Sequence, residues 1–283
     1  MPNQERLPLL CKTLRERGSQ KSRIQKSKFK DYNSVLFVMI NPWIVYPKPN
    51  PQANLRLFCF PFAGAGASFF KPWADQLLPQ IEVCAVQLPG RENRIKEPLF
   101  SQLTPLLQEM IPALLPEFDR PFAFFGHSLG ALICFESARQ LRRLKHRQPF
   151  HLFISARQAP NTPDLHPPIH QLPEAEFFEQ VCRFNGTPSV VLQNPQLMKL
   201  FVRILRADLA IAETYSYIEE APLDCPISAF SGLQDEVVLT VSLNAWCEQT
   251  HSKFQLHTFP GNHFFIKNKQ KEISQVISQT LLG

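Results

Sequence analysis

The stretch FAFFGHSLG, residues 122–130, decides how the rest of the chain is interpreted. Its first four residues are apolar, as in a buried strand, and a helical pattern follows. Between them, the G-x-S-x-G motif places Ser128 on a sharp strand-to-helix turn beside the start of the helix. Gly126 and Gly130 suit this turn, because a Cβ at either position would collide with the neighbouring strand or helix. The motif alone often arises by chance, but with this strand and helix it predicts a nucleophilic serine.

Short apolar runs alternate with helical patterns from Trp43 onward, which is typical of β-α units around a mostly parallel sheet. We predict strands at 55–60, 81–88, 122–125, 151–155, 227–230 and 254–259. Helices are predicted at 68–79, 101–117, 129–145, 239–250 and 264–282. Because the strand segments are almost continuously apolar, helices should cover both faces of the sheet. The sequence therefore predicts an α/β fold with one core.

The segment at about 160–218 interrupts this alternation, since it is longer than a simple connection and carries helical patterns at 173–184 and 195–217. It opens with a proline-rich loop and offers an apolar face made by Phe177, Phe178, Phe184, Leu197, Leu200, Phe201 and Leu205. One interpretation is ordinary packing of a helical pair. We favour the other, a mobile helical lid that shapes an acyl pocket over the site.

Residues 1–42 form a basic extension that precedes the domain predicted at 43–283. Nine Lys or Arg and three Asp or Glu lie within residues 1–38, which accounts for the whole net charge of +6. The extension has too little periodic apolar surface to offset its ordering entropy, so we expect it to be disordered. Because the remainder is neutral, the charge gives no reason to expect a nucleic-acid partner.

The cysteine pattern indicates a reduced, cytoplasmic protein. There are seven cysteines without a C-x-x-C pair, and four lie inside apolar runs: Cys59, Cys84, Cys134 and Cys225. No signal-peptide pattern and no run of 18 apolar residues occurs, so we expect no membrane association. No Cys/His cluster has metal-ligand spacing, and we expect a monomer with neither a metal nor a cofactor.

A nucleophilic serine needs a base, and in hydrolases with this motif the acid and then the histidine follow the serine along the chain. His263 fits best, because it lies in the turn FPGNHFF, residues 259–265, directly after the last predicted strand. Four other histidines precede the late strands and two lie before or within the last one, while His127 belongs to the serine motif. We predict His263 as the base.

The acid that orients this base should follow the preceding strand. Asp235 does so, in FSGLQDEV at residues 230–237, where a carboxylate can accept the imidazole N–H and stabilise the imidazolium. Its rivals are Asp208 and Glu236. Asp208 lies in the middle of a helical pattern, which suits a helix-surface or scaffold role better. We therefore predict Asp235.

The negative charge that develops on the substrate oxygen needs backbone N–H donors. Leu129, at the start of the helix after Ser128, supplies one. The second should come from CFPFAGAG, residues 59–66, and Ala63 is the candidate. A phosphate-binding loop is the alternative, but G-x-G-x-x-G is absent and no P-loop lysine follows.

Six motifs in this order resemble the type II thioesterases associated with non-ribosomal peptide and polyketide synthases. They are CFPFAGAG (59–66), VQLPGRE (86–92) with Arg94, GHSLG (126–130), RADL (206–209), GLQD (232–235) and GNH (261–263). The family usually has a tyrosine and two adjacent glycines where this chain has Phe62 and Gly64-Ala65-Gly66. The basic extension has no counterpart in the family.

The resemblance implies an α/β-hydrolase fold and hydrolysis of acyl thioesters on the phosphopantetheine arm of acyl or peptidyl carrier proteins. Such an enzyme removes stalled or wrongly loaded groups. Ser128 would form an acyl-enzyme that water, activated by His263, then hydrolyses. Arg91 and Arg94 would either face the substrate or form structural salt bridges.

Two other functions remain open at this point. A serine esterase acting on small soluble esters would share fold and triad, because these do not fix the substrate. A binding module without chemistry would keep the fold alone.

Overall fold

The computed structural model describes residues 41–163, 166–183, 191 and 193–283. The predicted basic extension lies almost entirely outside the described residues, and the compact unit begins at Asn41. Within the described ranges, no helix is long and apolar enough to span a bilayer.

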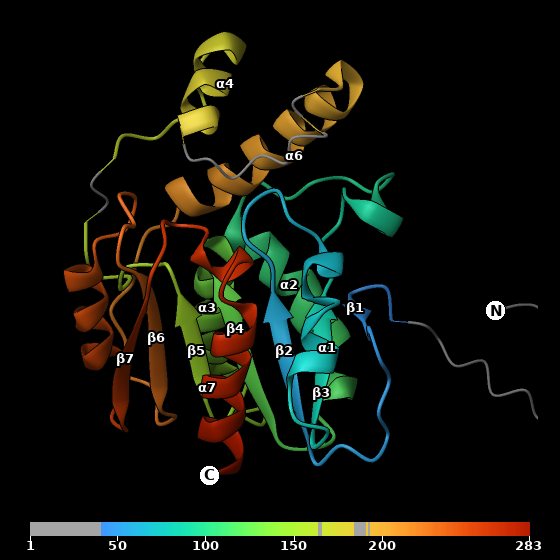
Figure 1. Ribbon diagram of the computed structural model, residues 1–283, viewed down its shortest axis with the longest axis vertical. Helices are drawn as coiled ribbons and strands as arrows, with labels where there is room; N and C mark the ends of the chain where they lie inside the picture. Colours follow the sequence, from blue (N-terminus) through green and yellow to red (C-terminus); the bar gives the residue numbers. More distant parts are fainter. Residues whose placement is uncertain (1–40, 164–165, 184–190, 192) are drawn as a thin grey trace, which may run out of the picture. The chain divides into compact units, whose positions relative to one another are not determined.

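A seven-stranded sheet forms the centre of this unit, with the strand order β1-β3-β2-β4-β5-β6-β7 (Figure 1). All neighbouring strands are parallel except β1 and β3. The strands are β1 Ile44–Val45, β2 Leu55–Phe60, β3 Ile81–Val86, β4 Phe122–His127, β5 Leu152–Ser155, β6 Ile227–Gly232 and β7 Phe254–Phe259. The prediction of a mostly parallel sheet is confirmed. It missed β1, because two residues are too few to show a strand pattern.

The α-helices of the described chain are α1 Trp73–Gln76, α2 Leu103–Leu114, α3 Leu129–Arg143, α4 Glu174–Arg183, α6 Pro195–Glu213 and α7 Gln270–Leu282. Two of the predicted helices are wrong in part. The segment predicted at 68–79 is divided into a 3₁₀-helix, Ala67–Phe70, and the short α1, which Pro72 precedes and an extended Leu77 ends. The segment Thr240–Gln249 is a 3₁₀-helix, because its first half holds β-branched and short polar residues with low α-helix propensity.

Alternating side chains of the central strands enter two apolar layers. Phe58 and Phe124 pack under α2 and α3, together with residues such as Leu132. Their neighbours, such as Leu57, point to the other face, where α1 and α7 cover them with Trp73, Ile273 and Ile277. The prediction that helices cover both faces is therefore confirmed.

The described helices of the connection from β5 to β6 lie beyond the carboxyl ends of the strands (Figure 1). Helix α6 begins after Asn194, whose side-chain oxygen accepts hydrogen bonds from the backbone N–H of Gln196 and Leu197. Pro195 occupies the first helical position, where no N–H is needed.

Helices α4 and α6 share a small core of their own, made by Ile169, Phe177, Val181, Val202 and Leu205. Phe178 and Leu197, predicted to belong to the apolar face, are 36% and 40% exposed. Phe184, also assigned to that face, lies outside the described residues. The two helices therefore pack as a pair, and a lid function for them stays a prediction.

Candidate active site

The chain order places the site at a switch in the sheet. From β2 the chain moves outward to β3, and it then returns to the other side of β2 to form β4. In open α/β sheets, the crevice beyond the carboxyl ends of two such strands is where ligands bind. The loop carrying Ala63 follows β2, and Ser128 follows β4.

Ser128 occupies a backbone conformation that non-glycine residues rarely adopt, with φ 53° and ψ −112°. Two glycines make this turn possible. A Cβ on Gly126 would lie 2.1 Å from the carbonyl oxygen of Gly130, and one on Gly130 would lie 2.1 Å from that of Phe60. The sharp turn from β4 into α3 thus exposes the hydroxyl of Ser128 at a strained position.

The structure brings His263 and Asp235 to this serine, although 135 residues separate Ser128 from His263. Nε2 of His263 lies 3.2 Å from Oγ of Ser128, and Nδ1 lies 2.9 Å from Oδ2 of Asp235. A carboxylate can only accept, so the Nδ1–H of His263 donates to Asp235. Nε2 is then free to accept the hydroxyl proton of Ser128, which is the arrangement that activates a serine.

Asp235 is held in place by the turn in which it lies. Its Oδ1 accepts hydrogen bonds from the backbone N–H of Val237 at 2.9 Å and of Val238 at 3.0 Å. The turn is also tied to the histidine loop, because Gln234 donates its backbone N–H to the carbonyl of Gly261 and accepts that residue's N–H. Only Oδ2 is left to meet the imidazole.

A second histidine lies behind the first. His127 is completely buried, its ring centre is 5.5 Å from that of His263, and its Nδ1 lies 2.9 Å from Oγ of Ser155. Burial, together with repulsion from a protonated His263, lowers the pKa of His127 well below the usual histidine value. His127 is therefore neutral beside the base. No sequence motif identifies its partner Ser155, which lies on β5.

The two predicted oxyanion donors lie on segments in contact. The carbonyl oxygens of Phe60 and Pro61 lie against Gly130 at the beginning of α3, so the loop after β2 starts beside Leu129. Leu129 is the first residue of α3, where backbone N–H groups have no partner within the helix.

The orientation of Ala63 follows from its neighbours. The carbonyl of Phe62 accepts the N–H of Ala65 at 3.0 Å. In a trans peptide the C=O and N–H point in opposite directions, so the N–H of Ala63 points away from that turn bond. The N–H of Ala63 therefore takes no part in this turn bond, and its role as an oxyanion donor stays a prediction.

Asp208, a rival for the acid, lies elsewhere in the hydrogen-bond network. It is fully buried and pairs with Arg91, so the expected scaffold role fits while a helix-surface position is wrong. Arg94 is buried as well, pairs with Glu97 and lies over the ring of Trp43. Both arginines thus form structural salt bridges. Glu236, the other rival, is exposed.

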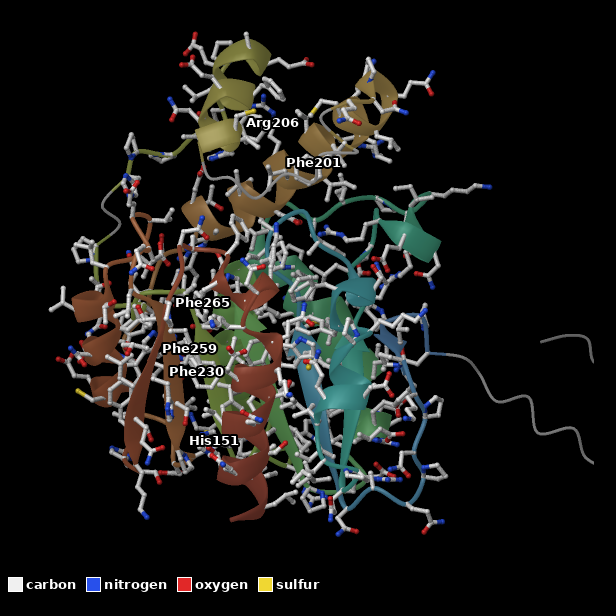
Figure 2. All side chains as sticks on the ribbon, in the orientation of Figure 1. His151, Phe201, Arg206, Phe230, Phe259 and Phe265 are labelled. Atoms are coloured by element: carbon white, nitrogen blue, oxygen red, sulfur yellow. The ribbon has the colours of Figure 1, made fainter. Side chains whose placement is uncertain are left out.

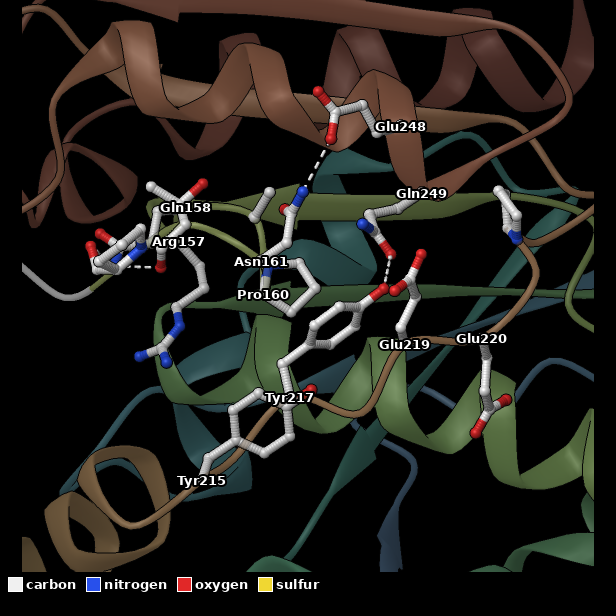
Figure 3. A pocket seen from close by; sticks show the side chains of 14 residues that line it. Arg157, Gln158, Pro160, Asn161, Tyr215, Tyr217, Glu219, Glu220, Glu248 and Gln249 are labelled. Carbon is white, nitrogen blue, oxygen red and sulfur yellow. Dashed lines mark hydrogen bonds between the residues drawn. The ribbon is translucent and has the colours of Figure 1, made fainter.

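A cavity of about 770 Å³ opens where the loop after β5 meets the segment after α6 (Figure 3). Its walls include Tyr217, whose hydroxyl donates to Gln249, and Asn161, which donates to Glu248. None of Ser128, Asp235 and His263 lines it. In the part of the chain that is described, no group of His, Cys, Asp and Glu residues is suited to hold a metal ion.

Comparison with known proteins places this geometry in a family. The Thioesterase domain family model matches residues 55–281. Linear gramicidin dehydrogenase LgrE of Brevibacillus parabrevis is 42% identical, over 84% of this chain and 92% of that protein. Gramicidin S biosynthesis protein GrsT of Aneurinibacillus migulanus is 41% identical, over 86% and 94%.

Solved structures agree with the sequence relatives. The type II thioesterase BorB from the borrelidin biosynthetic cluster superposes with a TM-score of 0.74 at 33% identity, covering 84% of this chain and 95% of BorB. The family match spans β2 to β7 and includes the serine turn and the histidine loop. The chain therefore belongs to the Thioesterase domain family, and within it to the type II thioesterases of peptide and polyketide synthase clusters.

Proposed function

We propose that this enzyme hydrolyses acyl thioesters on the phosphopantetheine arm of acyl or peptidyl carrier proteins, and so frees a synthase from stalled or aberrant acyl groups. The observation that carries the chemistry is the hydrogen-bonded series Ser128–His263–Asp235, with spacings of 3.2 Å and 2.9 Å. The carrier-protein substrate is supported by the relatives, whose names refer to gramicidin S biosynthesis and to the borrelidin cluster.

Acylation begins when Oγ of Ser128 attacks the thioester carbonyl carbon while its proton passes to Nε2 of His263. The resulting oxyanion accepts hydrogen bonds from the backbone N–H groups of Leu129 and Ala63. The C–S bond then breaks, and the departing sulfur receives the proton from His263. Asp235 stabilises the imidazolium while it exists.

Deacylation repeats these steps with water as the nucleophile. His263 takes a proton from a water molecule, which attacks the acyl-serine carbonyl, and the same proton returns to Oγ of Ser128 as the ester bond breaks. The products are a free acid and a carrier protein with its thiol restored. These steps use side chains and backbone groups of the chain itself.

The partner is thus a carrier protein bearing the phosphopantetheine arm, and we propose that the enzyme meets it in the cytoplasm as a monomer. We also propose that the helices α4 and α6 act as a lid, which is supported by their position beyond the strand ends at which the site is built (Figure 1).

The word dehydrogenase in the name of LgrE is no reason to propose that activity for this chain. The turn after β2 reads GAGASF over residues 64–69, and Phe69 stands where a dinucleotide fingerprint needs its third glycine. A serine esterase acting on small soluble esters remains the competing function, because it would use the same triad.

The assay compares acyl-loaded carrier protein with a p-nitrophenyl ester of the same acyl group. We expect a higher kcat/KM for the carrier-bound thioester, and a preference for the free ester would reject the carrier-protein function. Ser128→Ala should abolish both activities while carrier protein still binds. Turnover that survives this substitution would remove Ser128 as the nucleophile, and binding without any wild-type turnover would identify a binding module.

A further inference from the structure

Two sequence motifs that the triad does not use meet inside the protein. Asp208 of the RADL motif on α6 and Arg91 of the QLPGRE motif after β3 form a two-pronged ion pair, with N–O distances of 2.6 Å and 2.8 Å. Their exposed fractions are 0% and 4%. The planar guanidinium thus matches the carboxylate in the geometry that gives the strongest pairs.

The same pair also holds the loop after β2. Oδ2 of Asp208 accepts the backbone N–H of Gly64 at 2.8 Å, and Nη1 of Arg91 donates to the carbonyl of Ala65 at 3.2 Å. These bonds fix the peptide unit between Ala63 and Gly64 and the unit between Ala65 and Gly66. The loop is thereby attached to α6 and to the segment after β3 at once.

Gly64 shows how closely the helix approaches this loop. Its φ is +81°, and a Cβ there would lie 2.8 Å from the ring of Phe201 on α6. Phe201 and Ala63 both pack against the small core of α4 and α6, and Figure 2 shows Phe201 beside α6. A shift of α6 therefore displaces the loop that carries the predicted oxyanion donor.

We propose that the Arg91–Asp208 pair is a positioning device, which sets the N–H of Ala63 for the oxyanion and makes that setting depend on α6. The inference rests on the proposed function, in which Ala63 is a donor. A purely stabilising pair is a poor explanation, because a buried ion pair contributes little net stability compared with well-packed apolar residues. An apolar pair also lacks an acceptor for the N–H of Gly64.

The double variant Arg91→Met with Asp208→Leu separates the two roles. It fills the space with apolar side chains, so we expect the fold to be retained, but it removes the acceptor for the N–H of Gly64. We expect kcat to fall about 10- to 100-fold with little change in KM. A misplaced oxyanion donor should lower kcat less than a deleted donor does. The affinity for an alkylboronic acid, which forms a tetrahedral adduct on serine, should fall by a similar factor.

Glu97→Gln is the matched control. It removes the partner of Arg94 on the same segment but touches no residue of the loop at 62–66. Wild-type kcat and boronate affinity are expected for it. A folded double variant that behaves like this control overturns the proposal.

If the double variant does not fold, Asp208→Asn tests the same proposal. Its amide oxygen can still accept the N–H of Gly64, but the ion pair with Arg91 is lost. Unchanged kcat and boronate affinity in that variant overturn the proposal. Both readouts use a p-nitrophenyl ester and a boronic acid, which need no carrier protein. A wild-type enzyme that hydrolyses the ester but no carrier-bound thioester would therefore reject the proposed function alone.

Discussion

Gly232 and Gly261 lie so close together that a methyl group on Gly232 would be 2.6 Å from the carbonyl oxygen of Gly261. Gly232 ends β6 just before the turn of Asp235, and Gly261 precedes His263 after β7. The absence of a side chain at 232 is what lets the acid loop and the histidine loop approach each other. The 2.9 Å contact between Asp235 and His263 depends on this approach.

Gly232→Ala should therefore reduce catalysis by separating the two loops. The new methyl group would also meet the carbonyl of Asn262 at 2.7 Å, so the backbone has to move. Misplacement of about 1 Å can cost about 100-fold in rate, and we expect kcat to fall by about 10- to 100-fold. Steady-state kinetics on a folded sample measure this, and a wild-type kcat would show that the loops can separate without loss.

Strain at the nucleophile leads to a stability prediction. Ser128 has φ 53°, which glycine accepts more easily than serine or alanine. Ser128→Gly and Ser128→Ala should both be inactive. The glycine variant should have the larger free energy of unfolding by about 1 kcal/mol, because the relief of backbone strain outweighs the greater conformational entropy of glycine in the unfolded chain. Urea denaturation of the two variants checks this. Equal midpoints would mean that the turn stores no strain.

Asp235→Asn should preserve the turn and damage the chemistry. The amide oxygen can still accept from Val237 and Val238, but the NH₂ group then faces Nδ1 of His263 and favours the wrong tautomer. A loss of about 10⁴-fold in kcat is the size seen when such an aspartate becomes asparagine in a serine protease. Glu236→Gln, at the exposed neighbour, is the control and should keep wild-type kcat. A similar loss in both variants would argue against Asp235.

Acid should destabilise the protein through His151, which lies toward the end of the sheet opposite Phe201 (Figure 2). Its Nε2 meets Oγ of Ser228 at 2.9 Å, and burial, then repulsion from His257, lowers the pKa of His151 to about 4. The unfolded chain binds this proton at about pH 6.5, so below that pH it gains protons that the folded chain does not. The contribution of His151 to the free energy of unfolding is thus fully present above about pH 6.5. It decreases by up to about 3 kcal/mol as the pH falls toward about 4.

The measurement is the free energy of unfolding of His151→Gln and wild type between pH 7 and pH 4. We expect the variant to show a flatter pH dependence than the wild type. His251→Gln, at a histidine with a 60% exposed side chain, should leave the dependence unchanged. If the free energies of unfolding of wild type and His151→Gln depend on pH in the same way, His151 is not the source of the destabilisation by acid.

Several parts of the structure could be predicted because their signals are local. The six longer strands are rich in apolar residues, and the serine motif contains its own turn chemistry. The three residues Ser128, Asp235 and His263 could be chosen together because each follows a strand, and parallel strands end at one edge of a sheet. The structure brings these three together, while their catalytic roles stay predictions.

Other features depend on contacts between distant segments and have no local signal. The strand β1 is defined only by its pairing with β3, and Thr240–Gln249 takes a 3₁₀ form that apolar periodicity does not distinguish from an α-helix. The pairing of Arg91 with Asp208 joins residues 117 positions apart. Both residues belong to motifs, VQLPGRE and RADL, but nothing in either motif identifies the other as its partner.

The order of the strands also determines when during synthesis the enzyme acquires its chemistry. The predicted nucleophile follows β4 and the predicted oxyanion loop follows β2, at the middle of the sheet, whereas the predicted base follows β7 at its outer edge. A ribosome-bound chain that has folded its first strands holds a serine without a proton acceptor. With these predicted roles, such a nascent chain should not cleave a thioester until β7 has paired with β6 and brought His263 to Ser128.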